Sequence, residues 1–212
     1  MSRGNAEVIH AGSLRETVCR IPMTIRCFIS VNLPDDAKAA INSIVTELKK
    51  TGADVKWVNA ENIHLTLKFL GDTDEQLIPR ISDALCKKLS HYKAFYITIA
   101  DAGCFPSEKR PRVVWIGIED SETLADIQKD VDDVLTDFGF SYEARSFSPH
   151  LTIGRVRSPK KVVELMDRFA EFRGKAFGRV EVNAVHIMRS ELKPAGAEYS
   201  CLCRIPLKYR EE

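Results

Sequence analysis

Apolar residues recur along this chain with two different periods, and each period indicates one kind of element. Four stretches repeat apolar residues every three or four positions, the spacing of a helix that packs one face against a sheet. Between them lie segments of alternating or β-branched residues, which predict strands. The predicted helices are residues 35–51, 77–89, 124–138 and 162–172. The predicted strands are residues 25–31, 55–58, 63–69, 95–100, 113–118, 150–156, 179–187 and 199–207.

The order of these elements repeats. Each half of the chain has the order strand, helix, strand, helix, strand, and a central strand in each half carries the pattern His-x-Thr-x. An internal duplication explains this economically. Strands interrupted by helices form sheets with helices on the outer face. We therefore expect an α+β fold with two pseudo-symmetric lobes, each a β-sheet with outer helices, around a central cleft; the pattern alone leaves parallel and antiparallel pairing open.

The length and the first residues define the expected domain. A chain of 212 residues falls within the range in which one compact domain buries a continuous core. Residues 1–22 are polar and lack an apolar period, which predicts a loose N-terminal arm. We expect a single bilobal domain over residues 23–212.

Charge and cysteine content narrow the function classes. Lys and Arg number 31 against 30 Asp and Glu, so the chain has no global positive field to hold a long nucleic acid, and any such ligand must be bound locally. Six cysteines occur without a repeated CxxC and without a secretory leader, which favours reduced thiols in the cytoplasm. Cys201 and Cys203 lack a second pair to complete a zinc site. No apolar stretch approaches the roughly 20 residues that cross a bilayer.

The two His-x-Thr-x motifs are the candidate chemistry. Because strand side chains alternate between faces, His64, Thr66 and Lys68 are expected on one face and the apolar residues between them on the other. His150 and Thr152 have the same arrangement in the second motif. A cleft between the lobes would then receive one histidine and one threonine from each wall.

This set of side chains suits phosphodiester cleavage without a metal or cofactor. One histidine removes a proton from the attacking water, the other protonates the leaving oxygen, and threonine hydroxyls donate hydrogen bonds to the non-bridging oxygens. A lone histidine on a strand is more often structural, but two copies in duplicated positions favour a site. Zinc binding lacks an evident third ligand. The remaining histidines, His10, His91 and His186, are expected to be structural or solvent-exposed.

The motifs resemble a known family. Residues 60–71 (Ala-Glu-Asn-Ile-His-Leu-Thr-Leu-Lys-Phe-Leu-Gly) and 148–155 (Ser-Pro-His-Leu-Thr-Ile-Gly-Arg) are similar to the 2H phosphoesterase superfamily, and within it to the RNA 2′,3′-cyclic phosphodiesterases, also called 2′-5′ RNA ligases. The resemblance extends from about residue 23 to the C-terminus. It implies that His64 is the proton donor and His150 the proton acceptor, and that a 2′-phosphate is left.

The resemblance also directs attention to the residues that follow each motif. Arg155 stands where the family commonly has arginine, a candidate phosphate partner, although strict alternation places it opposite His150 unless a bulge at Gly154 turns it. Thr66 and Thr152 are the other expected phosphate-binding residues. Lys68 is expected either to attract the RNA backbone or to belong to a solvated surface. Phe69 is expected in the core because it shares a face with Leu67.

Three functions remain open on these observations. The first is hydrolysis of a terminal 2′,3′-cyclic phosphate, with RNA 3′ ends or cyclic nucleotides as the substrate. The second is the reverse reaction, which joins a cyclic phosphate to a 5′-hydroxyl and makes a 2′-5′ linkage. The third is an RNA-end binding module whose histidines only contact phosphate. No cofactor, metal, membrane or obligate protein partner is expected.

Overall fold

The structure is a computed structural model that describes residues 23–194 and 196–209. The expected loose arm, residues 1–22, lies outside the described residues. Four α-helices and nine strands form in the described part. The helices are α1 (Asp35–Lys49), α2 (Ile78–Leu89), α3 (Glu122–Thr136) and α4 (Val162–Ala170). The strands are β1 (Thr24–Asn32), β2 (Val55–Trp57), β3 (His64–Asp74), β4 (Phe95–Phe105), β5 (Val113–Glu119), β6 (His150–Val156), β7 (Ala176–Val182), β8 (Ala184–Lys193) and β9 (Gly196–Pro206).

All nine strands belong to one sheet, in the order β7-β4-β5-β6-β3-β1-β8-β9, with β2 paired to β6. Every pairing between these strands is antiparallel. The central strands β3 and β6 pair only through Leu65 and Leu151. The expected α+β class is confirmed, and the two halves of the sheet, one in each lobe, are joined at this one pair.

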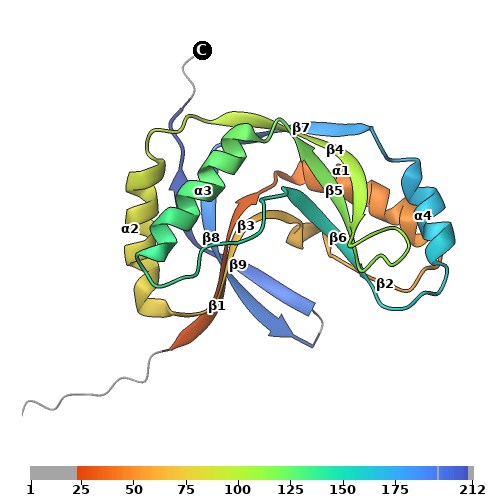
Figure 1. Cartoon of the computed structure of the whole chain (residues 1–212), viewed down its shortest axis with the longest axis horizontal. Coiled ribbons are helices and arrows are strands. Elements are labelled where there is room, and N and C mark those ends of the chain that lie inside the picture. The colour runs from red at the N-terminus through yellow and green to blue at the C-terminus, as the bar shows by residue number, and fades with distance from the viewer. Residues whose placement is uncertain (1–22, 195, 210–212) are drawn as a thin grey trace, which may run out of the picture.

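The lobes are built from both halves of the chain. In the first lobe, β1, β3, β8 and β9 are covered by α2 and α3; in the second, β2 and β4 to β7 are covered by α1 and α4 (Figure 1). The C-terminal strand β8 pairs with the first strand β1, so the chain returns to the lobe where it started. The repeated order of elements therefore does not correspond to two consecutive lobes. In the described part, no helix is both long and apolar enough to span a membrane.

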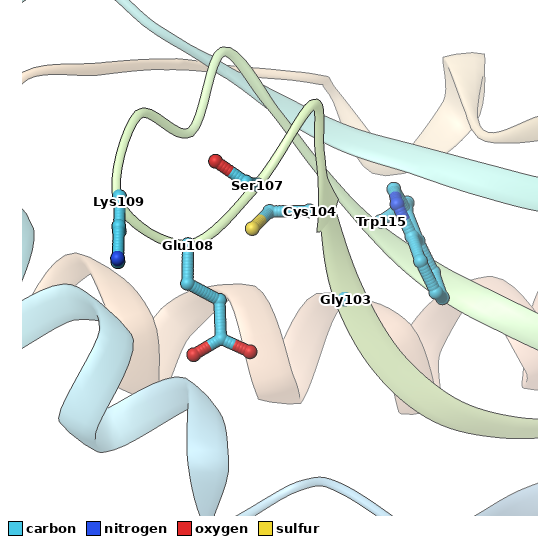
Figure 2. Close-up of a pocket in the computed structure, with 6 residues that line it drawn as sticks. All are labelled: Gly103, Cys104, Ser107, Glu108, Lys109 and Trp115. Atoms are coloured by element: carbon cyan, nitrogen blue, oxygen red, sulfur yellow. The ribbon is translucent and has the colours of Figure 1, made fainter.

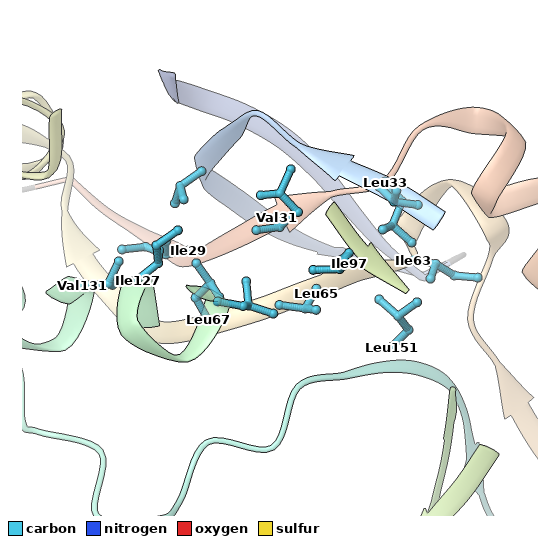
Figure 3. Close-up of a cluster of buried hydrophobic side chains, with 14 of the residues drawn as sticks. Ile29, Val31, Leu33, Ile63, Leu65, Leu67, Ile97, Ile127, Val131 and Leu151 are labelled. Atoms are coloured by element: carbon cyan, nitrogen blue, oxygen red, sulfur yellow. The ribbon is translucent and has the colours of Figure 1, made fainter. Parts of the chain in front are cut away.

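The core follows the apolar stripes of the sequence. Helix α2 buries Ile81 and Leu85, and α3 buries Ile127 and Val131. Figure 3 shows the two α3 residues beside Ile29 and Leu67 of the sheet, and Leu65 near Leu151 where the lobes join. These stripes match the predicted helix faces, because an amphipathic helix that packs on a sheet buries its apolar face.

A β-bulge interrupts each central strand three residues after its histidine. On β3, Thr66 pairs with Ser30 and Lys68 with Ile29, so Leu67 is the extra residue. On β6, Thr152 pairs with Trp115 and Gly154 with Val114, so Ile153 is the extra residue. A bulge inserts one residue into the alternation of side chains. The two residues that follow each bulge therefore lie on the face opposite to the one that strict alternation predicts.

Candidate functional site

Four sequence-predicted residues lie together on one face at the junction of the lobes. The antiparallel pair Leu65–Leu151 sets His64 opposite Thr152 and Thr66 opposite His150. Leu65 and Leu151 are buried, whereas the two histidines and two threonines are half-exposed on the other face, here called the central face. Side chains directly opposite one another have Cβ atoms about 4.5–5.5 Å apart, and diagonal neighbours about 7–8 Å apart. At that spacing, the four side chains are close enough to contact one small ligand together.

Both histidine rings are oriented by the same type of hydrogen bond. His64 Nδ1 lies 2.7 Å from the carbonyl oxygen of Asn62, and His150 Nδ1 lies 2.7 Å from that of Ser148. Because a carbonyl only accepts, each Nδ1 carries the proton and donates it. Each Nε2 is left for other chemistry: it accepts a proton when the ring is neutral and donates one when the ring is charged.

Aromatic rings enclose both imidazoles. Phe28 stacks on His64 with centroids 4.6 Å apart, and Tyr199 meets it edge-on at 5.2 Å. Around His150, Phe105 lies edge-on at 5.1 Å and Trp115 lies at 6.3 Å. These rings restrict the rotation of the imidazoles and exclude water from their sides. The sequence alone assigned none of the four to the histidines, because they come from β1, β9, β4 and β5.

Asn62 links the first histidine to a distant strand. Its backbone carbonyl orients His64, and its side-chain amide donates to the carbonyl oxygen of Ala197 at 2.7 Å. Ala197 precedes Tyr199 by two residues on β9. The bond therefore holds the part of β9 that places Tyr199 against His64.

The position of Trp115 depends on a close approach to glycine. Trp115 is paired with Gly103 on β4, and a Cβ at that position would overlap the indole ring. The ring also lines a hollow, together with Gly103, Cys104 and the loop residues Ser107 to Lys109 (Figure 2). Only glycine lets the ring lie flat on β4 next to His150.

The Ile153 bulge decides the direction of Arg155. Gly154 faces the core, because a Cβ there would lie 2.7 Å from Val55 and 3.1 Å from Val114. Arg155 follows it and is exposed, so it points to the opposite side, the central face. From the sequence, this orientation was expected only if a bulge occurred at Gly154. The structure has the bulge one residue earlier, at Ile153. In the described part of the chain, Arg155 makes no ion pair.

The Leu67 bulge overturns two expectations. Phe69 was expected in the core, but its side chain is 68% exposed and lies opposite Phe28, with ring centroids 6.3 Å apart. Lys68 was expected on the face of His64, as an RNA contact or a solvated residue, but it is only 7% exposed and lies 2.6 Å from Asp132. Both expectations were wrong because they extended strict alternation through the bulge.

The remaining described histidines, His91 and His186, lie outside the two motif strands. His10 falls outside the described residues. His91 is exposed just after the end of α2, and His186 is half-buried on β8. Among residues 23–194 and 196–209, no three or more His, Cys, Asp or Glu side chains are grouped so that they could hold a metal ion.

Burial lowers the pKa of two histidines. Desolvation lowers the pKa of His64, and the nearby Lys38 charge lowers it further, against the opposing effect of the Asn62 carbonyl. Burial is also the main reason why the pKa of His186 is lowered, with a smaller contribution from Arg204. Both rings therefore hold a proton less readily in the folded protein than in the unfolded chain.

We expect the free energy of unfolding to decrease as the pH falls from about 7.5 to about 5.5. Below the ordinary histidine pKa of about 6.5, the unfolded chain takes up protons that the folded state excludes. The stabilisation is therefore complete above that pH and is lost as the pH falls through the lowered pKa values. Urea unfolding at several pH values measures this. The slope should be smaller in His186→Gln than in the wild type; an equal slope in the two proteins contradicts the assignment.

Comparison with solved structures shows the same fold. TT0787 of Thermus thermophilus superposes with a TM-score of 0.74 at 24% identity, covering 88% of this chain and 100% of that one. E. coli LigT complexed with 3′-AMP superposes with a TM-score of 0.69 at 22% identity, covering 87% and 99%.

Sequence comparison finds relatives with a higher sequence identity than these two solved structures. An RNA 2′,3′-cyclic phosphodiesterase of Methanothermobacter thermautotrophicus is 39% identical over 178 residues, which cover 84% of this chain and 96% of the relative. A protein of the same name from Thermotoga maritima is 35% identical over 182 residues, covering 84% and 93%. A family model described as the 2′-5′ RNA ligase superfamily matches residues 33–194, which include both His-x-Thr-x motifs. This chain therefore belongs to the 2′-5′ RNA ligase superfamily.

Proposed function

We propose that this protein is an RNA 2′,3′-cyclic phosphodiesterase that opens a terminal cyclic phosphate and leaves a 2′-phosphomonoester. The relatives that carry this name cover most of the chain, and the LigT structure with the same fold holds 3′-AMP. The observation that carries the proposal is the matched pair of histidines. Each has Nδ1 bound to the carbonyl two residues before it, and both stand on the central face with a threonine from the opposite strand.

The two histidines divide the proton transfers. His150 in its neutral form accepts a proton from water at Nε2 while the water oxygen attacks phosphorus. His64 in its charged form donates its Nε2 proton to the 3′ oxygen as the bond from phosphorus to that oxygen breaks. At the end His150 is charged and His64 is neutral, and exchange with solvent restores both. The lowered pKa of His64 makes its charged form a stronger acid.

Side chains of the protein stabilise the negative charge that develops on the phosphate oxygens in the transition state. Thr66 and Thr152 donate hydrogen bonds to the non-bridging oxygens, one from each lobe. Arg155, exposed on the central face, supplies a positive charge and a planar set of donors that suits phosphate. With these groups in place, we propose that the reaction proceeds without a metal ion or cofactor.

The same site is also suited to 2′-5′ ligation, in which an alcohol takes the place of water as the nucleophile. In ligation, a 5′-hydroxyl replaces water and the 2′-5′ bond forms as the cyclic phosphate opens, with the same two proton transfers. The description of the matched family model supports ligation as the second candidate function.

We also propose a cytoplasmic location. It is supported by the free thiols of the described cysteines Cys27, Cys86, Cys104, Cys201 and Cys203.

Phosphorus NMR of 2′,3′-cyclic AMP, incubated with the protein and an excess of chelator, tests the proposal. We expect the cyclic phosphate signal to be replaced by one that matches authentic 2′-AMP. A signal that matches 3′-AMP would reverse the assignment of the leaving oxygen, and an unchanged cyclic signal would exclude metal-independent hydrolysis of this nucleotide. A parallel incubation of RNA halves, one with a cyclic phosphate and one with a 5′-hydroxyl, detects ligation as a longer strand.

A further inference from the structure

The segment that leads into His150 has no helix or strand of its own. Residues 137–149 connect α3 of the first lobe to β6 of the second, and residues 141–146 are exposed (Figure 1). This segment ends with Ser148, whose carbonyl orients His150. A chain without regular hydrogen bonds and with little burial is placed only by its specific contacts with the rest of the protein.

The side chains of Phe138, Phe140 and Phe147 pack against the core. The long-range hydrogen bonds to the backbone of residues 141–147 come from one buried ion pair. Lys68 Nζ lies 2.6 Å from Asp132 Oδ1 and donates a hydrogen bond to the carbonyl oxygen of Ser141 at 2.8 Å. Asp132 Oδ2 accepts from the backbone N–H of Glu143 at 3.2 Å and from Gln128 at 3.0 Å. In the described structure, the bonds to Ser141 and Glu143 are the hydrogen bonds that tie the backbone of residues 141–147 to the rest of the protein.

Stability alone does not account for a buried pair of charges. Lys68 and Asp132 are 7% and 2% exposed, and desolvation of two such ions offsets much of their attraction. Apolar residues of similar volume often give equal or greater stability at such positions. Apolar side chains, however, offer no hydrogen bonds to the Ser141 carbonyl or the Glu143 amide.

The pair also connects the two histidine strands. Lys68 follows the bulge on β3, four residues after His64, and Asp132 lies on α3, from which the segment to His150 departs. The ion pair therefore links the strand that carries His64 to the segment that leads into His150. A misplacement of about 1 Å between catalytic groups lowers rates by about 10²-fold.

We propose that Lys68 and Asp132 are positioning residues that fix the segment 137–149 and thereby set the distance between His150 and His64. Neither residue contacts the reacting atoms. The proposal rests on the proposed function for its catalytic consequence, but the placement of His150 is a separate, measurable property.

Three variants separate positioning from stability. Lys68→Met leaves Asp132 buried without its partner and is expected to lower the melting temperature. Lys68→Met/Asp132→Leu removes both charges and is expected to recover most of that loss. In both, kcat for 2′,3′-cyclic AMP should fall about 10–100-fold with KM within about threefold of the wild type. Lys88→Met is the matched control, since Lys88 of α2 pairs with Asp130 of the same helix α3 at 41% exposure.

The ring signals of the histidines provide a readout that does not need activity. In nitrogen-15 NMR of the double variant, we expect the Nδ1–H of His150 to shift or exchange faster, and that of His64 to stay unchanged. A double variant with a recovered melting temperature, wild-type kcat and an unchanged His150 signal would overturn the proposal. If the wild type itself shows no turnover, the proposed function fails, and the His150 signal alone decides whether the pair positions the segment.

Discussion

Replacing His64 or His150 by alanine is expected to lower kcat for hydrolysis of 2′,3′-cyclic AMP by about 10²–10⁴-fold. Positioned general acids and bases contribute about that factor, and both Nε2 atoms stand at the central face because Nδ1 of each is held by a backbone carbonyl. The measurement is steady-state kinetics of His64→Ala and His150→Ala, with the melting temperature taken for each.

The controls for this prediction distinguish catalysis from binding. His91→Ala removes an exposed histidine just after α2 and should leave kcat unchanged. The double variant His64→Ala/His150→Ala should lose less than the product of the single losses, since residues that act as a unit are not additive. A wild-type protein that binds RNA ends without turnover, together with a His150→Ala variant that still binds, would instead identify an RNA-end binding module.

Truncating the leucines at the junction of the lobes is expected to cost the most stability. Leu65 and Leu151 are fully buried, at 0% exposure, and form the single registered pair between β3 and β6. Leucine-to-alanine changes in such sites cost about 2–5 kcal/mol, from the lost transfer energy and from the cavity left behind. Urea unfolding of Leu65→Ala and Leu151→Ala measures this cost.

The exposed Leu192 provides the matched control. It is 74% exposed on β8, so Leu192→Ala should change the free energy of unfolding by no more than about 0.5 kcal/mol. Equal effects at Leu151 and Leu192 would mean that the junction is not a packed core.

Local pattern was enough to find the four helices, most of the strands and the two motifs, but it predicted one strand at residues 179–187 where the structure has two, β7 and β8, which lie in different lobes. The apolar stripes of α2 and α3 and the alternation in β3 and β6 are properties of neighbouring residues, so the sequence displays them directly. The placement of His64 and Thr66 on one face follows from the same alternation, which holds up to the bulge.

What the sequence could not predict depends on partners far along the chain. The bulges at Leu67 and Ile153 exist only in the register with β1 and β5, and the Leu67 bulge made the expectations for Phe69 and Lys68 wrong. Tyr199 reaches His64 through the return of β9 to the first lobe. A buried lysine in a strand looks like an exposed one until Asp132 is seen beside it.

The two bulges occupy equivalent places on β3 and β6, but the residues that follow them differ. The two sides of the nearly twofold central face are therefore not equivalent. The fifth residue after each histidine emerges on the shared surface, and it is Phe69 on one side and Arg155 on the other. One side thus presents an exposed aromatic ring and the other an exposed cation. A ligand with a planar end and an anionic end would contact different residues in its two possible orientations. The two orientations therefore differ in binding energy even though the backbone is nearly symmetric.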